Sequence, residues 1–289
     1  MNLPNIIQLM RPRHYVKNLF IFLPLFFALR ITDTALLLST LLTFVAFSLS
    51  ASAIYILNDY RDIEEDRLHP QKQKRPLACG AISKPLALLI MTMLFITGFS
   101  LITSLSLKAS GILAIYVGLN IAYSFYLKHI AIIDVTIIAI GFVLRLFIGA
   151  AVADIHLSMW IVIMTFLLAL FLALAKRRDD VLIYLETGQK MRKVIDGYNL
   201  QFLDGAMMIM ASVVIVAYTI YTTSSEVIER VHSEYIYLTA LFVIMGILRY
   251  LQITFVFKDS GSPTRVIFKD HFIQLTLLAW FLSFTWIIY

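Results

Sequence analysis

Long apolar stretches recur along most of this chain, and they limit its possible folds more than any other feature. A helix that crosses a bilayer needs about 20 apolar residues. The composition also indicates a membrane protein, since 60% of the residues are hydrophobic and only 15% are charged. In a soluble domain, about a quarter of the residues are charged. We therefore predict an all-α polytopic membrane protein that forms a single domain over residues 1–289. The nine predicted crossing helices lie at about 15–30, 35–57, 86–107, 111–127, 130–152, 156–175, 203–223, 235–256 and 270–288.

Basic residues are distributed unevenly among the predicted loops. If the N-terminus is cytoplasmic, 19 of the 24 lysines and arginines lie in the inner segments. Only Arg30, Lys108 and Arg230 lie in the outer segments. Because cytoplasmic loops of membrane proteins carry an excess of Lys and Arg, this distribution predicts a cytoplasmic N-terminus and an external C-terminus.

The most charged interruption follows the second apolar stretch and reads NDYRDIEEDRLHPQKQKRP over residues 58–76. If the preceding helix continues through it, Asn58, Asp62 and Asp66 recur at i, i+4 and i+8 and share one stripe. Carboxylate and amide oxygens suit a hard divalent cation such as Mg²⁺, for which Mn²⁺ can substitute. The stripe therefore predicts a metal site, in which water and substrate phosphate oxygens complete the coordination.

A mixed charge run between two apolar stretches is often only a solvated loop. The helical spacing of its acids and its position at the membrane boundary, where uncompensated charge is costly, favour a site. His69 and Pro70 predict the end of the helix, because proline disfavours helix in the residue before it. Lys72, Lys74 and Arg75 follow at once and would hold the phosphate charge that the metal leaves uncompensated.

A second charged segment, KRRDD at residues 176–180, follows the sixth apolar stretch. One interpretation is a positive-inside flank with a local ion pair between Lys176 and Asp180, which would be neighbours on a helix. The other is a phosphate site that uses Lys176, Arg177 and Asp180, because this loop is more basic than acidic. The two longest inner loops, about 58–85 and 176–202, are thus the two candidate motif loops.

Three further segments carry candidate residues. Arg145 lies inside a predicted helix with no nearby acid, so either it faces a polar pocket or it snorkels to the outer surface. Tyr123 and Lys128, at the inner end of the fourth helix, are either phosphate contacts or interfacial flanks. The basic segment 11–18 either lies along the anionic membrane surface or contributes Lys17 to the cytoplasmic mouth.

These motifs together resemble the UbiA superfamily of intramembrane prenyltransferases, nine-helix proteins with two inner motif loops. Their first motif, N-D-x-x-D-x-x-x-D, is matched by Asn58, Asp59, Asp62 and Asp66. The chain is most similar to the decaprenyl-phosphate phosphoribosyltransferases. Their further segments R-P-x-x-W/Y-x-K-N, D-x-x-H-P-x-K-x-x-R-P, Y-S-x-x-L-K and G-F-x-x-R are matched at residues 11–18, 66–76, 123–128 and 141–145. In their K-R-Y-x-E segment, this chain has Arg178 and Asp180 in place of tyrosine and glutamate.

The resemblance implies that 5-phosphoribose moves from phosphoribosyl diphosphate (PRPP) to a polyprenyl phosphate, such as decaprenyl or undecaprenyl phosphate. It implies a multi-pass protein of the bacterial inner membrane that makes cell-envelope glycan precursors and has no nucleic-acid partner; it permits a homo-oligomer. Mg²⁺ would be held by Asn58, Asp62 and Asp66, and the catalytic candidates are Asp62, Asp66, Lys17 and Arg145. The candidates for substrate and phosphate binding are Lys17, Lys74, Arg75, Tyr123, Lys128, Arg145, Lys176, Arg177 and Asp180.

Two other functions are consistent with parts of the sequence. Aromatic prenyltransferases of the same superfamily carry a second D-x-x-x-D motif for a prenyl diphosphate. Here Ile183 and Tyr184 stand four residues beyond Asp179 and Asp180, which argues against that donor. An anion transporter would place its site at the membrane midplane on broken helices, whereas the charges of this chain gather at the inner boundary.

Overall fold

The computed structural model describes residues 3–68, 72–188, 190, 192–258 and 263–288, and every regular element in these ranges is a helix. Within these ranges, seven helical segments are long and apolar enough to cross a membrane. They are α3 (Thr34–Arg61), α5 (Lys84–Leu105), α6 (Leu107–Phe125), α7 (Ile133–Ala153), α8 (Met159–Thr187), α9 (Leu200–Thr223) and the segment Glu234–Phe255 formed by η5 (Glu234–Thr239) and α11 (Ala240–Phe255). The predicted class, an all-α protein with many membrane-spanning helices, is confirmed.

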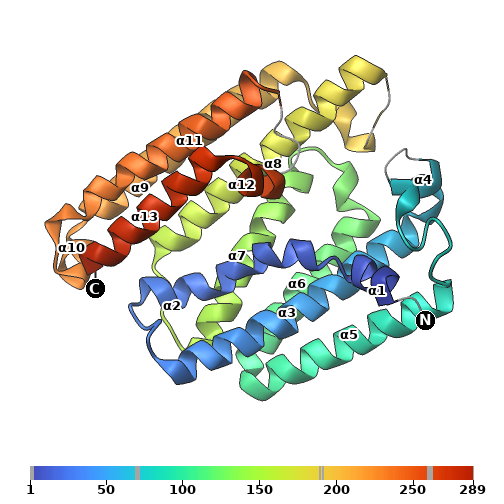
Figure 1. Cartoon of the computed structure of the whole chain (residues 1–289), viewed down its shortest axis with the longest axis horizontal. Helices are drawn as coiled ribbons and strands as arrows, with labels where there is room; N and C mark the ends of the chain where they lie inside the picture. Colours follow the sequence, from blue (N-terminus) through green and yellow to red (C-terminus); the bar gives the residue numbers. More distant parts are fainter. Residues whose placement is uncertain (1–2, 69–71, 189, 191, 259–262, 289) are drawn as a thin grey trace. The chain divides into compact units, whose positions relative to one another are not determined.

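Shorter helices complete the described chain. The pair α12 (Pro263–Lys269) and α13 (His271–Ile288) is also apolar enough to cross a membrane but is bent by 85°. The others are α1 (Leu3–Met10), η1 (Pro12–Phe22), α2 (Leu23–Phe27), α4 (Ile63–Leu68), η2 (Lys72–Lys74), η3 (Leu127–His129), η4 (Lys193–Gly197) and α10 (Ser225–Val231). Figure 1 traces these elements in chain order.

The chain divides into two compact units. The N-terminal unit comprises residues 1–126 and 141–157, and the C-terminal unit comprises residues 127–140 and 158–289. The first turns of α7 therefore belong to the C-terminal unit and the rest of that helix to the N-terminal unit. Each unit is described separately below.

In the N-terminal unit, α3 and α5 run side by side (Figure 1). Their close approach depends on Gly98 of α5, because a Cβ atom there would lie 2.7 Å from the carbonyl oxygen of Ala46 and would meet the hydroxyl of Ser50. Small residues allow helix backbones to approach closely within a membrane, where packing replaces the hydrophobic effect as the driving force. Asp33 begins α3 by accepting hydrogen bonds from the backbone N–H groups of Ala35 and Leu36, both at 3.2 Å.

The first predicted helix differs from the structure. Residues 15–30 were expected to form one helix, but the chain forms the 3-10 helix η1 and then the short helix α2. Pro24 has no backbone N–H and cannot complete an α-helical hydrogen bond to residue 20. Instead the N–H of Leu23 donates to the carbonyl of Phe20, three residues back. The segment therefore follows a narrower path than an α-helix of the same residues.

In the C-terminal unit, α8 packs against α9, and α11 packs against α13 (Figure 1). Helix α8 continues to Thr187, well beyond its predicted end at 175, so the KRRDD segment is helical. It ends at Gly188, which adopts a φ of 69° and donates its N–H to the carbonyl of Tyr184 at 2.8 Å. Glycine reaches this left-handed conformation without the steric cost that a side chain adds.

Candidate active site

The N-terminal segment is fastened along one polar stripe of α3. Asn18 of η1 is buried and donates from Nδ2 to the hydroxyl of Ser48 at 2.9 Å. Tyr15, one turn earlier, has its hydroxyl 2.8 Å from that of Ser52. Because Ser48 and Ser52 are one helical turn apart, the two hydrogen bonds set the register of η1 on α3. The RPRHYVKN segment therefore lies beside the helix that leads into the acidic motif.

Asp59 and Asp66 are the two buried carboxylates of this region, exposed by 2% and 1% respectively. Arg11 forms an ion pair with Asp59. Arg75 bridges both acids, since its Nη1 lies 3.0 Å from Asp59 Oδ1 and 2.6 Å from Asp66 Oδ2. Lys72 Nζ is 3.9 Å from Asp66 Oδ1. Cations from both sides of the acidic motif thus hold its carboxylates in place.

The i, i+4, i+8 relation in the acidic motif persists across the junction of α3 and α4. The N–H of Asp62 donates to the carbonyl of Asn58 at 3.0 Å, and the N–H of Asp66 donates to the carbonyl of Asp62 at 2.7 Å. The backbone therefore keeps helical hydrogen bonding through Asp62, although this residue caps α3 with φ −91° and ψ 13°. His69 and Pro70, which predict the end of this helix, lie outside the described residues.

The Oδ1 atom of Asn58 is buried and has no hydrogen-bond partner in the described part of the chain. A buried amide oxygen without a partner costs free energy, and a divalent cation or its bound water would satisfy it. Among the described residues, no group of three or more His, Cys, Asp and Glu side chains is placed to hold a metal ion by itself. A ligand set of one amide and the carboxylates of Asp62 and Asp66 nevertheless suits a Mg²⁺ that keeps several water or phosphate ligands, so these residues fit the metal.

Arg145 is buried in the N-terminal unit, exposed by only 5%, so the protein encloses its side chain. Its Nε donates to Asn18 Oδ1 at 2.8 Å, its Nη1 to the carbonyl of Gly141 at 2.6 Å, and its Nη2 to the hydroxyl of Tyr116 at 3.2 Å. Its guanidinium also lies 5.0 Å from the ring centre of Phe47. Hydrogen-bond acceptors and an aromatic face therefore stabilise this cation, with no carboxylate within 4.0 Å among the described residues.

A close backbone contact sets the position of Arg145. Gly149, one helical turn further along α7, touches the backbone of Ile21 in η1 so closely that a Cβ atom would collide with the Ile21 carbonyl oxygen. That contact brings α7 onto η1 at the level where Arg145 meets Asn18. The sequence motif around residue 145 thus reaches the N-terminal motif through the packing of these two helices.

Lys17 lies beside this arrangement, with its side chain half-buried. Arg145 and Arg11 are close enough to repel its charge, and within the described ranges its ammonium has no hydrogen-bond or ion-pair partner. Three cations that converge in this way form an environment suited to an anion with several negative charges. Of the other candidates in this unit, Tyr123 is half-buried and Lys74 is exposed.

The candidates of the C-terminal unit gather around Arg177, which is exposed by only 1%. Its Nε donates to Asp134 Oδ2 at 2.5 Å and its Nη1 to Asp180 Oδ2 at 2.6 Å. Tyr198 donates its hydroxyl to Asp134 Oδ1 at 2.6 Å, and Arg192 Nε is 3.3 Å from Asp180 Oδ2. Burial and the hydrogen bond to Asp134 raise the pKa of Tyr198, which therefore remains a proton donor.

This network anchors the second motif loop at both of its ends. Arg177 lies on α8 before the loop, and Tyr198 lies just before α9, so Asp134 at the start of α7 joins the two. Lys128 and Lys176 are half-buried beside these elements. The structure thus brings Arg177 and Asp180 together and places Lys17, Arg145 and the acidic stripe in the other unit.

The sequence analysis assigned no site role to four residues of these networks. Arg11 and Asp59 were recognised only as members of matched motifs, and Asp134 and Tyr198 were not singled out. A signal existed for Asp134, since an acid next to a long apolar stretch requires a partner. No local pattern indicated the pair between Arg11 and Asp59, because the two residues are 48 positions apart.

Replacing Asp59 tests how much this charge cluster stabilises the N-terminal unit. Asp59→Asn removes a buried charge that Arg11 and Arg75 share, so we expect the free energy of unfolding in detergent to fall by about 1.5–3 kcal/mol. Thermal unfolding followed by tryptophan fluorescence measures the change. Glu226→Gln is the matched control, because its partner Arg230 is exposed and surface pairs contribute little. Equal effects of the two variants would contradict the prediction.

Comparison with known proteins identifies a matching family, two similar relatives and a similar solved structure. A model of the UbiA prenyltransferase family matches residues 19–276. The decaprenyl-phosphate phosphoribosyltransferase of Mycolicibacterium smegmatis is 30% identical over 287 residues, which cover 95% of this chain and 89% of that protein. Its counterpart in Corynebacterium glutamicum is 30% identical over 278 residues, which cover 95% and 83%. A UbiA homolog from Archaeoglobus fulgidus, solved with GPP and Mg²⁺, has a TM-score of 0.72 at 18% identity and covers 97% of this chain and 99% of that one.

Proposed function

Because this chain belongs to the UbiA prenyltransferase family, we propose that it is a membrane phosphoribosyltransferase that acts on a polyprenyl phosphate lipid. The donor is PRPP, the acceptor is decaprenyl or undecaprenyl phosphate, and the products are phosphoribosyl-polyprenyl phosphate and diphosphate. The relatives that carry this activity in their names support the choice of substrates. The observation that carries the proposal is that Arg11 pairs with Asp59 of the acidic motif and Arg145 binds Asn18, so that both ends of the segment that carries Lys17 are held in place.

The reaction exchanges one bond for another at the anomeric carbon of the ribose. The bond from that carbon to the diphosphate oxygen breaks, and a bond to a phosphate oxygen of the lipid forms. The transition state has oxocarbenium character, as in other glycosyl transfers. The acceptor oxygen is already anionic at neutral pH, so the protein needs to position and neutralise charge rather than remove a proton.

The proposed roles follow from charge and position. Asn58, Asp62 and Asp66 would hold Mg²⁺, with Mn²⁺ as a substitute; when bound, the ion neutralises the leaving diphosphate. Lys17 and Arg75 bind the remaining donor phosphate, assisted by Lys74 and by Tyr123 at the end of α6. Arg145 holds the neighbouring Asn18 by a hydrogen bond and adds positive charge, which favours a phosphate near Lys17. Lys128, Lys176, Arg177 and Asp180 form a separate set of proposed phosphate contacts within the C-terminal unit.

The proposed topology has nine crossings and a cytoplasmic mouth. The crossings comprise the seven long apolar helices, α13 together with its bend at α12, and the η1–α2 segment. The excess of basic residues in the inner loops supports a cytoplasmic N-terminus and an external C-terminus. PRPP, which is water-soluble, would then reach the site from the cytoplasm of the bacterial cell, while the lipid tail stays in the membrane. A homo-oligomer is compatible with this arrangement.

A transfer assay with purified protein in detergent tests the proposed reaction. It contains Mg²⁺, ribose-labelled PRPP and decaprenyl or undecaprenyl phosphate. We expect label to enter the lipid fraction only when both substrates and the metal are present, and a chelator to abolish the transfer. If the protein instead consumes a prenyl diphosphate and prenylates an aromatic acid, the donor assignment is wrong and the aromatic prenyltransferase alternative is correct.

A further inference from the structure

The face of α3 that meets the N-terminal segment includes a tyrosine hydroxyl that the protein does not bind. Positions i, i+4, i+7 and i+11 of this helix share one stripe, and here they are Ser48, Ser52, Tyr55 and Asp59. Ser48 and Ser52 bind side chains of η1, and Asp59 pairs with Arg11. The Tyr55 hydroxyl has no hydrogen-bond partner among the residues that the structure describes.

Two contacts fix the ring of Tyr55 against the segment that carries Lys17. The ring centre lies 5.4 Å from that of His14, and the Arg11 guanidinium lies over the same ring at 5.2 Å. Arg11 adopts a left-handed backbone conformation with φ 56°, which is costly for a residue with a side chain. In this conformation the one arginine contacts both Tyr55 and Asp59. The protein therefore holds the ring in place and leaves its hydroxyl available.

The Tyr55 hydroxyl lies in a positively charged environment, and its side chain is half-buried. Arg145 and Arg11 are both close enough to act on it electrostatically. Arg11 is paired with Asp59, whereas the hydrogen bonds of Arg145 go to neutral acceptors and leave its charge in place. A hydroxyl donor in such an environment suits an anion whose oxygens only accept hydrogen bonds, such as a phosphate.

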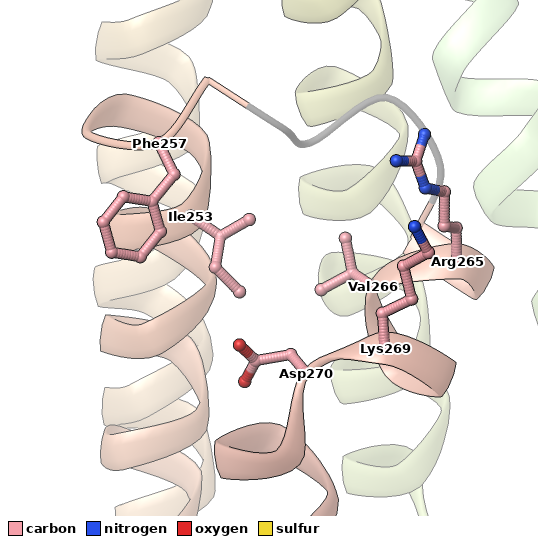
Figure 2. Close-up of a pocket in the computed structure, with 6 residues that line it drawn as sticks. All are labelled: Ile253, Phe257, Arg265, Val266, Lys269 and Asp270. Carbon is pink, nitrogen blue, oxygen red and sulfur yellow. The ribbon is translucent and has the colours of Figure 1, made fainter.

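The acid beside a pocket in the C-terminal unit is a useful contrast. Asp270 lines the pocket between α11 and α12 that Figure 2 shows. It pairs with Arg249 at 2.7 Å and accepts the backbone N–H of Ile273, in the first turn of α13, at 2.9 Å. These partners give Asp270 a structural role. The Tyr55 hydroxyl has no comparable partner in the described chain, so a ligand is the group that would satisfy it.

We infer that Tyr55 donates a hydrogen bond from its hydroxyl to a phosphate oxygen of a bound substrate. The inference rests on the proposed function for the source of this phosphate, which is either the 5-phosphate of PRPP or the phosphate of the polyprenyl lipid. Both groups present the same acceptor oxygens. Lys17 and Arg145 attract them by charge, which has little directional preference, whereas the single O–H of Tyr55 selects one oxygen and orients the group.

The variant Tyr55→Phe removes the hydroxyl and keeps the ring that contacts His14 and Arg11. Because the hydroxyl has no partner within the described residues, the midpoint of thermal unfolding in detergent should not change. Tyr15→Phe is the matched comparison, since it removes a hydroxyl that lies 2.8 Å from that of Ser52. It should lower the midpoint, because an intramolecular hydrogen bond is lost.

The transfer assay measures the contribution of the hydroxyl to substrate binding. Tyr55→Phe should raise KM for one of the two substrates about 10- to 100-fold, as expected for a lost hydrogen bond to a charged group. The kcat should change little, because the bond is present before and during the reaction. A rise in KM for PRPP assigns the phosphate to the donor, and a rise for undecaprenyl phosphate assigns it to the acceptor. Tyr235→Phe, which removes an exposed hydroxyl of the C-terminal unit, should leave both values unchanged.

Equilibrium binding separates this inference from the proposed reaction. PRPP with Mg²⁺, and undecaprenyl phosphate, are titrated separately into the unmodified chain and into Tyr55→Phe. If the unmodified chain binds these ligands but transfers no ribose, the proposed reaction is wrong, and weaker binding by the variant still supports the role of Tyr55. Equal affinities and equal KM values for the two chains would overturn that role. A loss of stability as large as that of Tyr15→Phe would also overturn it, because the hydroxyl would then have an internal partner.

Discussion

Asp62→Asn is expected to lower the rate of phosphoribosyl transfer by about a hundredfold or more. Asp62 is the middle member of the stripe formed with Asn58 and Asp66, and its amide replacement keeps the size of the side chain but removes its charge. The proposed Mg²⁺ would lose one of only two carboxylates, so its affinity falls together with the rate. The transfer assay at a series of Mg²⁺ concentrations measures both, and a higher half-saturating concentration is the signature of a lost metal ligand.

Glu64→Gln is the matched control for this experiment. Glu64 lies in the same charged segment, but it is exposed and forms its ion pair with Arg67, three residues along α4, at 3.0 Å. Its replacement removes the same charge from the segment without touching the stripe, and the transfer rate should not change. If Asp62→Asn keeps the full rate and the unmodified Mg²⁺ dependence, the stripe does not hold the metal.

Arg177→Met is expected to give the largest loss of stability. The substitution preserves the apolar length of the side chain but leaves the fully buried Asp134 and the partly buried Asp180 without their shared cation. Breaking a buried ion pair by removal of one partner costs about 3–5 kcal/mol, because an uncompensated charge remains. Thermal unfolding in detergent, followed by tryptophan fluorescence, measures the loss.

A double-mutant cycle with Asp134→Asn separates the ion pair from general packing. In Arg177→Met/Asp134→Asn the buried acid is neutral, so the double variant should be more stable than Arg177→Met alone. Additive losses would show that Arg177 and Asp134 do not interact energetically. Arg230→Gln, which removes an exposed arginine paired with Glu226 at 2.5 Å, should change the stability little.

The family and the general architecture were predictable from the sequence. Apolar stretches of spanning length predicted most of the long helices to within a few residues, since the bilayer imposes this length on any helix that crosses it. The N-D-x-x-D-x-x-x-D motif identified the UbiA family, and the family model confirms it. Predicted and observed helices differ at two places: the first segment breaks into η1 and α2, with Pro24 in the first turn of α2, and α8 continues to the glycine cap at Gly188.

The spacing of Asn58, Asp62 and Asp66 was likewise predictable, because one helical turn relates each residue to the next. The sequence alone therefore determined the class of the protein, its family and the register of its acidic stripe, all of which depend on neighbours within a few turns. Only the tertiary structure decided which distant arginines contact the residues of these motifs. Arg11 reaches Asp59 across 48 positions and Arg145 reaches Asn18 across 127. Such pairs depend on helix packing, including the contact of Gly149 with Ile21, and no local periodicity encodes them.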